Sequence, residues 1–234
     1  MAKYNRILLK LSGEALAQGS DGIYNHDFLN TVASVIKKCV DAGTSVAVMV
    51  GAGNIWRGRQ GVDMDRHTAD SMGMLATCVN ALMLKDSFVR AGMDACVLTS
   101  VEMTAFAEQY TVAKAKAYLD AGKVVVLGGG LGLPFFSTDT ASALRAAEIG
   151  ADVMLMAKNI DGVYTDDPKT NPEAKKLDTI SCREILRDGL RCIDSTAAAL
   201  CMDAHIPVLV FGLDDPENIY RAAMGENLGT VITY

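Results

Sequence analysis

Residues 123–139, KVVVLGGGLGLPFFSTD, join an unbroken apolar run to a stretch of glycines and then to a predicted helix over 140–149. Four consecutive apolar residues, Val124 to Leu127, are typical of a strand buried on both faces of a parallel sheet. Glycines have no Cβ, so backbone N–H groups in such a turn can approach an anion closely, and the start of a helix adds partial positive charge. The stretch therefore predicts a phosphate-binding turn at the end of a buried strand.

A second apolar strand, predicted over 46–50, ends in a similar turn, GAGN at residues 51–54. Each of the two strands follows an Asp-Ala-Gly sequence, at 41–43 and at 120–122. This recurrence is typical of helices that alternate with parallel strands in an α/β sheet. We call residues 128–132 the first glycine turn and residues 51–54 the second glycine turn. Two such turns in one chain predict a site that holds two phosphorylated partners at once.

The remaining pattern continues the alternation. Strands are predicted over 5–11, 46–50, 95–98, 123–127, 151–156, 207–211 and 230–233. Helices are predicted over 27–42, 65–90, 111–121, 140–149, 181–188, 195–204 and 215–224. We expect a turn at 12–14, a break in the 65–90 helix near Gly73, and a loop or short hairpin over 161–176. No low-complexity linker divides the chain, so a single domain is predicted over 1–234.

The charge and hydropathy of the chain exclude two classes of partner. The formal net charge is −6 and the pI is about 5.1, whereas nucleic-acid-binding proteins normally show a basic footprint. The longest nearly uncharged apolar run, residues 124–136, is shorter than the roughly 20 residues that a membrane-spanning helix needs. The first residues also lack the pattern of a secretory signal. We therefore expect no nucleic-acid partner and no membrane.

The cysteines and histidines point to a reduced, metal-free polypeptide. Six cysteines, at 39, 78, 96, 182, 192 and 201, form no C-x-x-C pair. Buried thiols of a cytosolic protein fit this pattern better than disulfides do, so a cytoplasmic location is expected. The three histidines, at 26, 67 and 205, are isolated and lack metal-site spacing, so we expect no metal held by protein ligands alone.

Two cations lie close to the predicted turns. Lys10 is in the last positions of the first strand, directly before Ser12-Gly13. A lysine there either reaches solvent from the sheet edge or neutralises phosphate, and the glycine turn favours phosphate. Arg57 follows the second glycine turn, where a guanidinium can bind phosphate in bidentate fashion. The alternative for residues 51–58 is an ordinary strand-to-helix turn.

Two common nucleotide-binding motifs are missing. The stretch GAGNIWRG, residues 51–58, resembles a dinucleotide fingerprint only in part, because Trp56 occupies the place of the third glycine. The chain also has no G-x-x-x-x-G-K-[ST] motif, so a Walker-type enzyme is excluded.

Several carboxylates have both an ordinary and a functional interpretation. Asp70 lies among methionines, where it either binds ribose hydroxyls or is a solvated helix carboxylate. One residue of STDT at 137–140, the stretch that contains Asp139, is expected to cap a helix, and so is Asp194, which does not exclude a role at phosphate. Residues 158–168, KNIDGVYTDDP, are an ordinary loop or an adenine site in which Tyr164 stacks on the base and carboxylates orient lysines or magnesium-bound water.

Taken together, these motifs resemble the bacterial uridylate (UMP) kinases of the amino acid kinase superfamily, over nearly the whole chain. The motifs are LKLSGE at 9–14, GNIWRG at 53–58, DSMGMLAT at 70–77, PFFSTD at 134–139, DGVYTDDP at 161–168 and GTVI at 229–232. The DSMGM stretch, with Arg57, distinguishes this family from amino acid kinases of the same fold. The resemblance implies a three-layer α/β/α sandwich with a central, mostly parallel sheet.

The resemblance also implies an activity and an assembly. The activity is transfer of the γ-phosphoryl group of ATP to UMP, which gives UDP for the supply of UTP and CTP. Mg²⁺, bound mainly through the ATP phosphates, is the implied cofactor. A cytoplasmic homohexamer, activated by GTP and inhibited by UTP, is the implied assembly.

Specific residues receive roles from the resemblance. The ATP phosphates are assigned to Lys10, Leu11, Ser12 and Gly13, and the junction of the two nucleotides to Gly53 and Arg57. The ATP base and ribose are assigned to Lys158 or Asn159, Tyr164 and Asp167. UMP is assigned to Ala52, Asp70, Leu131, Gly132, Leu133, Pro134, Phe135, Phe136, Ser137 and Thr138. Catalytic roles are assigned to Lys10, Arg57, Asp139, Asp161 and Asp194, with the three carboxylates arranging lysines and Mg²⁺.

The chain departs from the family pattern in three places. Many relatives have Thr and Asn where this chain has Leu131 and Leu133, so backbone groups must recognise the base here. Ala52 replaces the second glycine of a common Gly-Gly-Gly-Asn turn. Residues 17–24 lack the Gly-Phe-Gly-Ile pattern that is linked to the GTP response.

Three other functions compete with UMP phosphorylation. The first is another small-molecule kinase of this fold, acting on a carbamate, a carboxylate or a different phosphate. The second is a nucleotide-sensing protein without catalysis, which the presence of Lys10, Asp161 and Asp194 disfavours. The third is a dinucleotide oxidoreductase, which the incomplete fingerprint disfavours.

Overall fold

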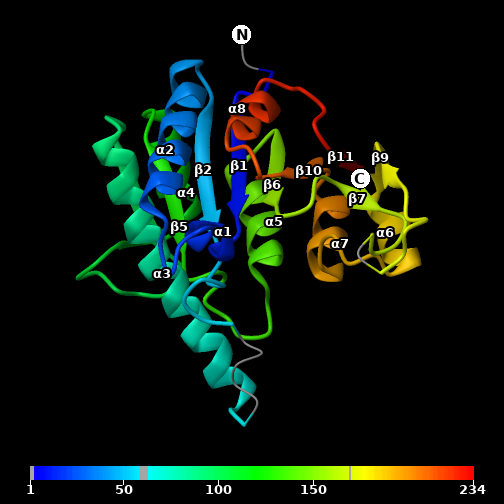
Figure 1. The fold of residues 1–234 in the computed structure, drawn as a ribbon. Helices are drawn as coiled ribbons and strands as arrows, with labels where there is room; N and C mark the ends of the chain where they lie inside the picture. Colours follow the sequence, from blue (N-terminus) through cyan, green and yellow to red (C-terminus); the bar gives the residue numbers. More distant parts are fainter. Residues whose placement is uncertain (1–2, 58–62, 169) are drawn as a thin grey trace.

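The computed structural model describes residues 3–57, 63–168 and 170–234. Its centre is a nine-stranded sheet in the order β4-β3-β5-β2-β1-β6-β10-β11-β9 (Figure 1). The strands are β1 (Arg6–Leu11), β2 (Ser45–Val50), β3 (Ala95–Thr99), β4 (Glu108–Gln109), β5 (Val124–Gly128), β6 (Val153–Lys158), β9 (Thr179–Ser181), β10 (Val208–Gly212) and β11 (Thr230–Thr233). Neighbouring strands pair in parallel, except that β10 and β11 are antiparallel.

Helices cover both faces of the sheet, so the predicted three-layer α/β/α class is confirmed (Figure 1). The helices are α1 (Gly13–Ala17), α2 (His26–Asp41), α3 (Arg66–Arg90), α4 (Val112–Asp120), α5 (Thr138–Ile149), α6 (Cys182–Asp188), α7 (Ser195–Asp203) and α8 (Glu217–Ala223). Apolar residues of α2, α3 and α8 pack on one face of the sheet, and those of α4, α5, α6 and α7 pack on the other.

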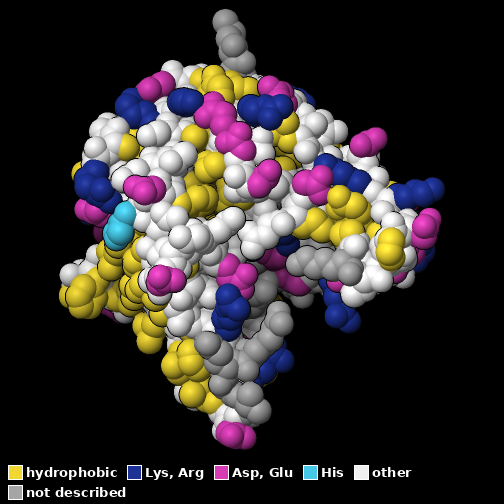
Figure 2. Space-filling view, in the orientation of Figure 1, with side chains coloured by type: hydrophobic (Ala, Val, Ile, Leu, Met, Phe, Trp, Pro, Cys, Tyr) yellow, Lys and Arg dark blue, Asp and Glu magenta, His cyan; other side chains and the backbone are white. Residues whose placement is uncertain are grey.

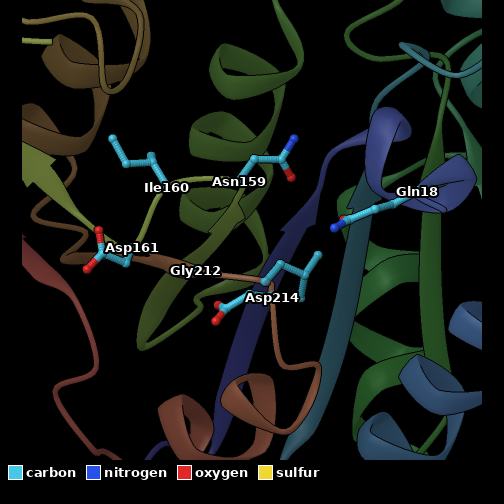
Figure 3. Close-up of a pocket in the computed structure, with 7 residues that line it drawn as sticks. Gln18, Asn159, Ile160, Asp161, Gly212 and Asp214 are labelled. Carbon is cyan, nitrogen blue, oxygen red and sulfur yellow. The ribbon is translucent and has the colours of Figure 1, made fainter. Parts of the chain in front are cut away.

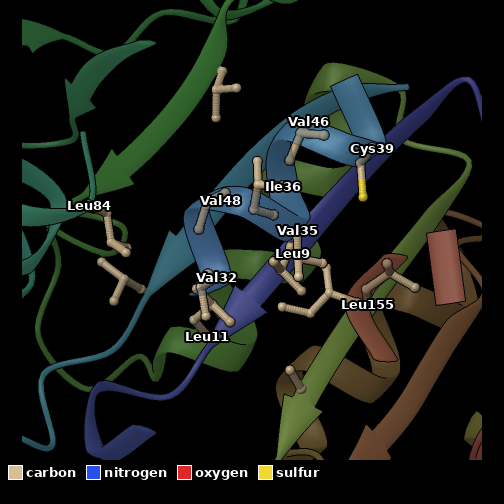
Figure 4. Close-up of a cluster of buried hydrophobic side chains, with 14 of the residues drawn as sticks. Leu9, Leu11, Val32, Val35, Ile36, Cys39, Val46, Val48, Leu84 and Leu155 are labelled. Atoms are coloured by element: carbon tan, nitrogen blue, oxygen red, sulfur yellow. The ribbon is translucent and has the colours of Figure 1, made fainter. Parts of the chain in front are cut away.

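The alternation of side chains along β1 determines the face of the sheet on which Lys10 lies. Ile7, Leu9 and Leu11 are buried in the cluster that α2 covers, as Figure 4 shows for Leu9 and Leu11. Leu8 is buried on the opposite face, beneath α5. Successive strand residues point to opposite faces, so Lys10 lies on the same face as Leu8 and points toward α5.

Two local expectations are corrected by the structure, and two short strands were not predicted. The 65–90 helix has no break, because α3 is continuous through Gly73 and its packed side chains offset the cost of about 1 kcal/mol for a helical glycine. The expected turn at 12–14 is instead the start of α1, a helix of five residues. Strands β4 and β9 were not predicted, since strands of two or three residues depend on their neighbours in the sheet.

Two further features bear on the predictions. The 161–176 segment contains a short antiparallel pair, β7 (Val163–Tyr164) and β8 (Lys176–Leu177), which confirms the hairpin alternative. Helix α3 is long and apolar enough to cross a membrane by length and composition alone. It packs against β5, β3 and α2, and a core helix of this kind passes the same test.

The strand order places a crevice at the centre of the sheet. From β1 the chain continues to β2 on one side, and it later returns to β6 on the other side of β1. At such a switch point the connections leave the carboxyl ends of neighbouring strands in opposite directions, which opens a crevice for ligands. Lys10, the second glycine turn and Lys158 all lie at these carboxyl ends.

Candidate active site

A carboxylate and two lysines form a cluster at the switch point. Lys158 ends β6, which neighbours β1, and it lies on the same face as Lys10 because Met154 and Met156 are also buried beneath α5. The first turn of α5 supplies Asp139 between them. Lys10 Nζ lies 2.9 Å from Asp139 Oδ1, and Lys158 Nζ lies 3.5 Å from Asp139 Oδ2. The side chain of Asp139 is only 15% exposed.

Two opposing effects act on the pKa of Asp139. Burial is the largest and would raise the pKa, because it disfavours the charged form. The charges of Lys10 and Lys158, with their hydrogen bonds, outweigh burial and hold the pKa of Asp139 below its ordinary value. At neutral pH the cluster therefore carries two positive charges and one negative charge. This net positive charge suits a site for phosphate groups.

Close packing of backbone joins the first strand to the second glycine turn. A Cβ on Gly13 would lie 2.5 Å from Gly53 N and 2.7 Å from Gly51 O, so no larger residue fits there without displacing the turn. The Gly51 N–H also donates to Leu11 O at 3.0 Å. Residues 11–13 and 51–53, which were predicted to hold phosphates, are therefore in direct contact.

The first cavity, called here the Asp70 cavity, has a volume of about 290 Å³. It is lined by Ala52, Gly53, Trp56, Ala69, Asp70, Gly73, Met74, Thr77, Gly130, Leu131, Leu133, Phe136, Ser137 and Thr138. Seven of the residues assigned to UMP from the resemblance line it: Ala52, Asp70, Leu131, Leu133, Phe136, Ser137 and Thr138. The other three, Gly132, Pro134 and Phe135, belong to the same loop but are not in the lining.

Asp70 holds the loop that closes this cavity. Its Oδ2 accepts the Phe135 N–H at 2.8 Å, and Arg66 Nε lies 3.6 Å from the same oxygen. Phe135 has a φ of 71°, a conformation that costs energy for a residue with a Cβ. The Arg66 guanidinium lies over the Phe135 ring at 4.6 Å. These contacts hold the strained residue in place, and none of the described residues donates a hydrogen bond to Asp70 Oδ1.

Residues that sequence reasoning missed contribute much of the wall. Trp56, the single tryptophan of the chain, donates from Nε1 to Ala69 O at 2.9 Å and lies against α3 near Gly73. Thr77 Oγ1 accepts the Gly129 N–H at 2.8 Å, which ties α3 to the first glycine turn. Trp56 could have been predicted as a site residue, because it is the single tryptophan of the chain and follows a glycine turn. Nothing in the local sequence distinguishes Thr77.

The second cavity, called here the Asp214 cavity, has a volume of about 320 Å³ and is shown in Figure 3. It is lined by Gln18, Asn159, Ile160, Asp161, Gly212, Leu213 and Asp214. Gln18 lies across it from Asp161 and Asp214. Asn159 and Asp161 were predicted site residues. Gln18 and Asp214 were missed, because they follow α1 and β10 and only the fold brings them to β6.

The expected adenine loop is in part beside this cavity. Asp161 Oδ1 accepts the Tyr164 hydroxyl at 2.8 Å, and Asp161 Oδ2 pairs with Lys176 Nζ at 2.9 Å. The hydrogen bond from Lys176 is the main cause that lowers the pKa of Asp161. Tyr164 and Asp167 do not line the cavity, and Lys158 pairs with Asp139 instead. Of the two alternatives at 158–159, only Asn159 lines it.

Asp194 connects two helices and caps one of them, as predicted. It is the N-cap of α7 and accepts the Ala197 N–H at 2.9 Å. Its two oxygens also accept the hydroxyls of Ser137 and of Thr140, the latter at 2.9 Å. Asp194 thus fixes the start of α5, which carries Asp139, whereas the two lysines of the cluster bond to Asp139 itself.

Arg57 lies at the far side of the second glycine turn. Its Nε donates to Gly53 O at 3.0 Å and lies 3.3 Å from Glu14 Oε1, and its side chain is largely exposed. Gly58, the last residue of the GNIWRG motif, lies outside the described residues. Arg57 therefore lies on the predicted turn but is not part of the Lys10–Asp139–Lys158 cluster.

The acidic residues do not form a closed metal cage. Among residues 3–57, 63–168 and 170–234, no three Asp, Glu, His or Cys side chains are grouped so as to hold a metal ion. Mg²⁺ typically keeps several waters and binds through one or two carboxylates plus substrate phosphates. The donor set fits a magnesium ion carried mainly by a nucleotide.

Comparisons with known proteins agree with the α/β/α fold. Residues 5–212 match the amino acid kinase family. The structure is similar to UMP kinase from Bacillus anthracis, with a TM-score of 0.95, 38% identity, and coverage of 98% of this chain and 96% of that chain. It is also similar to UMP kinase from Ureaplasma parvum, with a TM-score of 0.93, 34% identity, and coverage of 99% and 100%. Uridylate kinase from Archaeoglobus fulgidus matches at a TM-score of 0.75 and 27% identity, covering 97% of this chain and 99% of that one. The chain belongs to the amino acid kinase family.

Proposed function

We propose that this protein transfers the γ-phosphoryl group of ATP to the phosphate of UMP and produces UDP and ADP. The single observation that carries the proposal is the position of the Lys10–Asp139–Lys158 cluster between two cavities. Thr138, next to Asp139, lines the Asp70 cavity, and Asn159, next to Lys158, lines the Asp214 cavity. The UMP kinases that this chain resembles at 38% and 34% identity support the choice of substrates.

The two cavities take different nucleotides in this proposal. The Asp70 cavity accepts UMP, because its apolar wall of Trp56, Leu131 and Phe136 suits a pyrimidine and Asp70 Oδ1 suits a ribose hydroxyl. The Asp214 cavity accepts the nucleoside part of ATP, with Asp161 and Asp214 as acceptors for its hydroxyl and amino groups. Leu131 and Leu133 have no polar side-chain atoms, so backbone groups recognise the pyrimidine.

Charge placement and alignment supply catalysis. The acceptor phosphate is already an anionic nucleophile, so no strong general base is required. Lys10 stabilises charge on the transferring group, and Asp139 holds Lys10 and Lys158 apart at a fixed spacing. Arg57 and the backbone amides of residues 12–13 and 52–53 bind phosphate oxygens. Mg²⁺, held through the ATP phosphates, supplies further positive charge when bound.

A coupled assay of ADP release across several acceptors tests the proposal. The panel is UMP, CMP, dTMP, carbamate and N-acetylglutamate, each with Mg²⁺ and ATP. Release with UMP well above the others is expected. Preference for carbamate or a carboxylate would instead identify another kinase of this fold. Tight UTP binding without ADP release from any acceptor would identify a nucleotide sensor.

The proposed assembly is a cytoplasmic homohexamer, with UTP as an inhibitor and GTP as an activator. Leu75, Val79, Leu82 and Val89 form an exposed apolar stripe on α3, and Leu75 and Val79 are 54% and 50% exposed. Figure 2 shows apolar side chains gathered on this side of the molecule. A stripe of this kind suits contact between copies of the chain. Sedimentation equilibrium and assays with each effector test these proposals separately.

A further inference from the structure

Arg145 is a buried cation that the proposed mechanism does not use. It lies on α5, is 7% exposed, and its partners are Glu148, Ser100 and Tyr110 rather than the residues of the lysine cluster. Its Nη1 donates to Glu148 Oε2 at 2.5 Å, and its guanidinium lies 3.8 Å from the centre of the Tyr110 ring. The Tyr110 hydroxyl donates to the same Glu148 oxygen at 2.8 Å. A buried charge is retained only where its partners are well placed, so its position here requires an explanation.

A second nitrogen of Arg145, Nη2, is connected to the first glycine turn through two hydrogen bonds. This nitrogen donates to Ser100 Oγ at 3.0 Å, and the Ser100 hydroxyl donates to Gly130 O at 2.6 Å. A serine hydroxyl has one proton, and the guanidinium occupies its acceptor side. The proton is therefore directed to the Gly130 carbonyl, and the positive charge polarises this hydrogen bond.

The orientation of the Gly130 carbonyl determines the orientation of the next N–H. The described residues contain no cis peptide bond, so the Gly130 C=O and the Leu131 N–H point in opposite directions. The carbonyl points to Ser100, which does not line the Asp70 cavity, whereas Gly130 and Leu131 do line it. The Leu131 N–H donates to no acceptor among the described residues. It is a polar donor on the wall of the proposed acceptor site.

The Gly130–Leu131 peptide is the central peptide of a turn, because the Gly132 N–H donates to Gly129 O at 2.8 Å. A Cβ on Gly132 would lie 3.2 Å from Ser100 O, so the loop and the Ser100 backbone are already near contact. The Gly128 carbonyl accepts the Ser100 N–H at 3.1 Å, which fixes Ser100 relative to the end of β5. Backbone contacts therefore hold Ser100 beside the loop, and its side chain makes the connection to Arg145.

We propose that Arg145 is a positioning residue that acts through Ser100 to orient the Gly130–Leu131 peptide, so that the Leu131 N–H donates to the pyrimidine of the acceptor nucleotide. This inference rests on the proposed function, because it takes the Asp70 cavity as the acceptor site. Arg145 does not touch the substrate. The Leu131 N–H that Arg145 orients provides a polar contact to the pyrimidine, which the side chains of Leu131 and Leu133 are unable to make.

The test is steady-state kinetics of S100A, R145K and the double variant, with the native full-length chain as reference. Losing one charge-assisted hydrogen bond is expected to raise the KM for UMP about tenfold, while the KM for ATP changes less than about twofold. If Arg145 acts through Ser100, the double variant raises the KM for UMP no more than S100A alone. S87A is the matched control, because Ser87 is also buried and accepts Arg90 Nη2 at 3.2 Å, far from the loop. It is expected to leave both KM values unchanged.

Each other outcome is decisive. An unchanged KM for UMP in S100A, or effects of S100A and R145K that multiply in the double variant, would overturn the positioning role. Equal increases in the KM for UMP and for ATP would also overturn it, since they indicate general loosening. Thermal denaturation of each variant identifies any loss of folding, and S100T, which keeps the hydroxyl, provides a second variant. A native chain that fails to phosphorylate UMP defeats the proposed function instead.

Discussion

The Asp70 cavity and the Asp214 cavity open at the same edge of the sheet, but different contacts hold them in shape. The Asp70 cavity has a loop tied at several points: Phe135 to Asp70, Gly129 to Thr77, and Gly130 to Ser100. The Asp214 cavity is lined by residues that follow α1, β6 and β10, and its carboxylates face solvent. The proposed acceptor side is therefore preorganised by polar contacts to α3 and Ser100, whereas the proposed donor side is a more open surface.

The lysine cluster belongs to neither cavity alone. Lys10 comes from the central strand, and Asp139 from the helix whose start lines the Asp70 cavity. Lys158 comes from the strand that leads into the Asp214 cavity. Substitutions in the cluster should therefore change turnover or stability, whereas substitutions in one cavity should change the KM of one nucleotide. The four predictions below test this separation, in order of decreasing effect.

Lys10→Ala should have the largest effect and should not distinguish between the cavities. Loss of one positioned donor to the transferring group is expected to reduce kcat by about 10³-fold, with changes below about fivefold in either KM. Steady-state kinetics with ATP and UMP measure this. Lys37→Ala is the control, because Lys37 pairs with Asp41 on the exposed face of α2. Near-normal turnover of Lys10→Ala would remove this lysine from the mechanism.

Asp139→Asn should destabilise the protein in a pH-dependent way. The folded-state pKa of Asp139 is lowered, so its contribution is fully present above the unfolded-state pKa, about 3.9, and is lost as pH falls through the folded-state pKa. We expect a loss of about 2 kcal/mol in the free energy of unfolding at pH 7, because two lysines lose a largely buried partner. The difference from the native chain should shrink below about pH 4.

Urea unfolding at several pH values measures this difference. Asp41→Asn is the matched control, since Asp41 forms an exposed pair with Lys37 that is worth less than about 0.5 kcal/mol. A difference for Asp139→Asn that stays constant from pH 7 to about pH 3 would contradict the lysine-paired state of Asp139.

Asp70→Asn should affect one nucleotide only. The amide keeps the shape of the carboxylate and can still accept the Phe135 N–H, but it loses the charge that strengthens a hydrogen bond to ribose. The KM for UMP is expected to rise about tenfold, while the KM for ATP remains within about twofold of the native value. A parallel rise for both nucleotides would show that the two cavities are not independent.

The sequence was most informative where one local rule acts alone. Apolar runs predicted β1, β2 and β5, and the glycines after β2 and β5 predicted the two turns. Lys10 was predicted as a site residue because it ends a buried strand directly before a glycine, where a lysine either reaches solvent or neutralises phosphate. The family resemblance assigned ten residues to UMP, and seven of them line a single cavity in the structure.

What the sequence did not predict depends on contacts between distant segments. Gln18 and Asp214 reach the same cavity only because α1 and β10 both end near β6. Thr77 was missed because its hydroxyl acts on Gly129, across the boundary between α3 and β5. Short elements such as α1 and β9 have too few residues for a periodic pattern, and the sheet supplies their stability.

Asp214→Asn should have the smallest effect, and it is the donor-side counterpart of Asp70→Asn. Asp214 is exposed at the rim of its cavity, so water weakens any hydrogen bond that it makes to ATP. The KM for ATP is expected to rise about threefold, with kcat and the KM for UMP unchanged. Measuring both variants with both nucleotides gives a crossed comparison in which each variant controls for the other. A larger rise in the KM for UMP than in the KM for ATP would contradict the assignment of the two cavities. The Asp214 cavity would then bind UMP, the nucleotide assigned here to the Asp70 cavity.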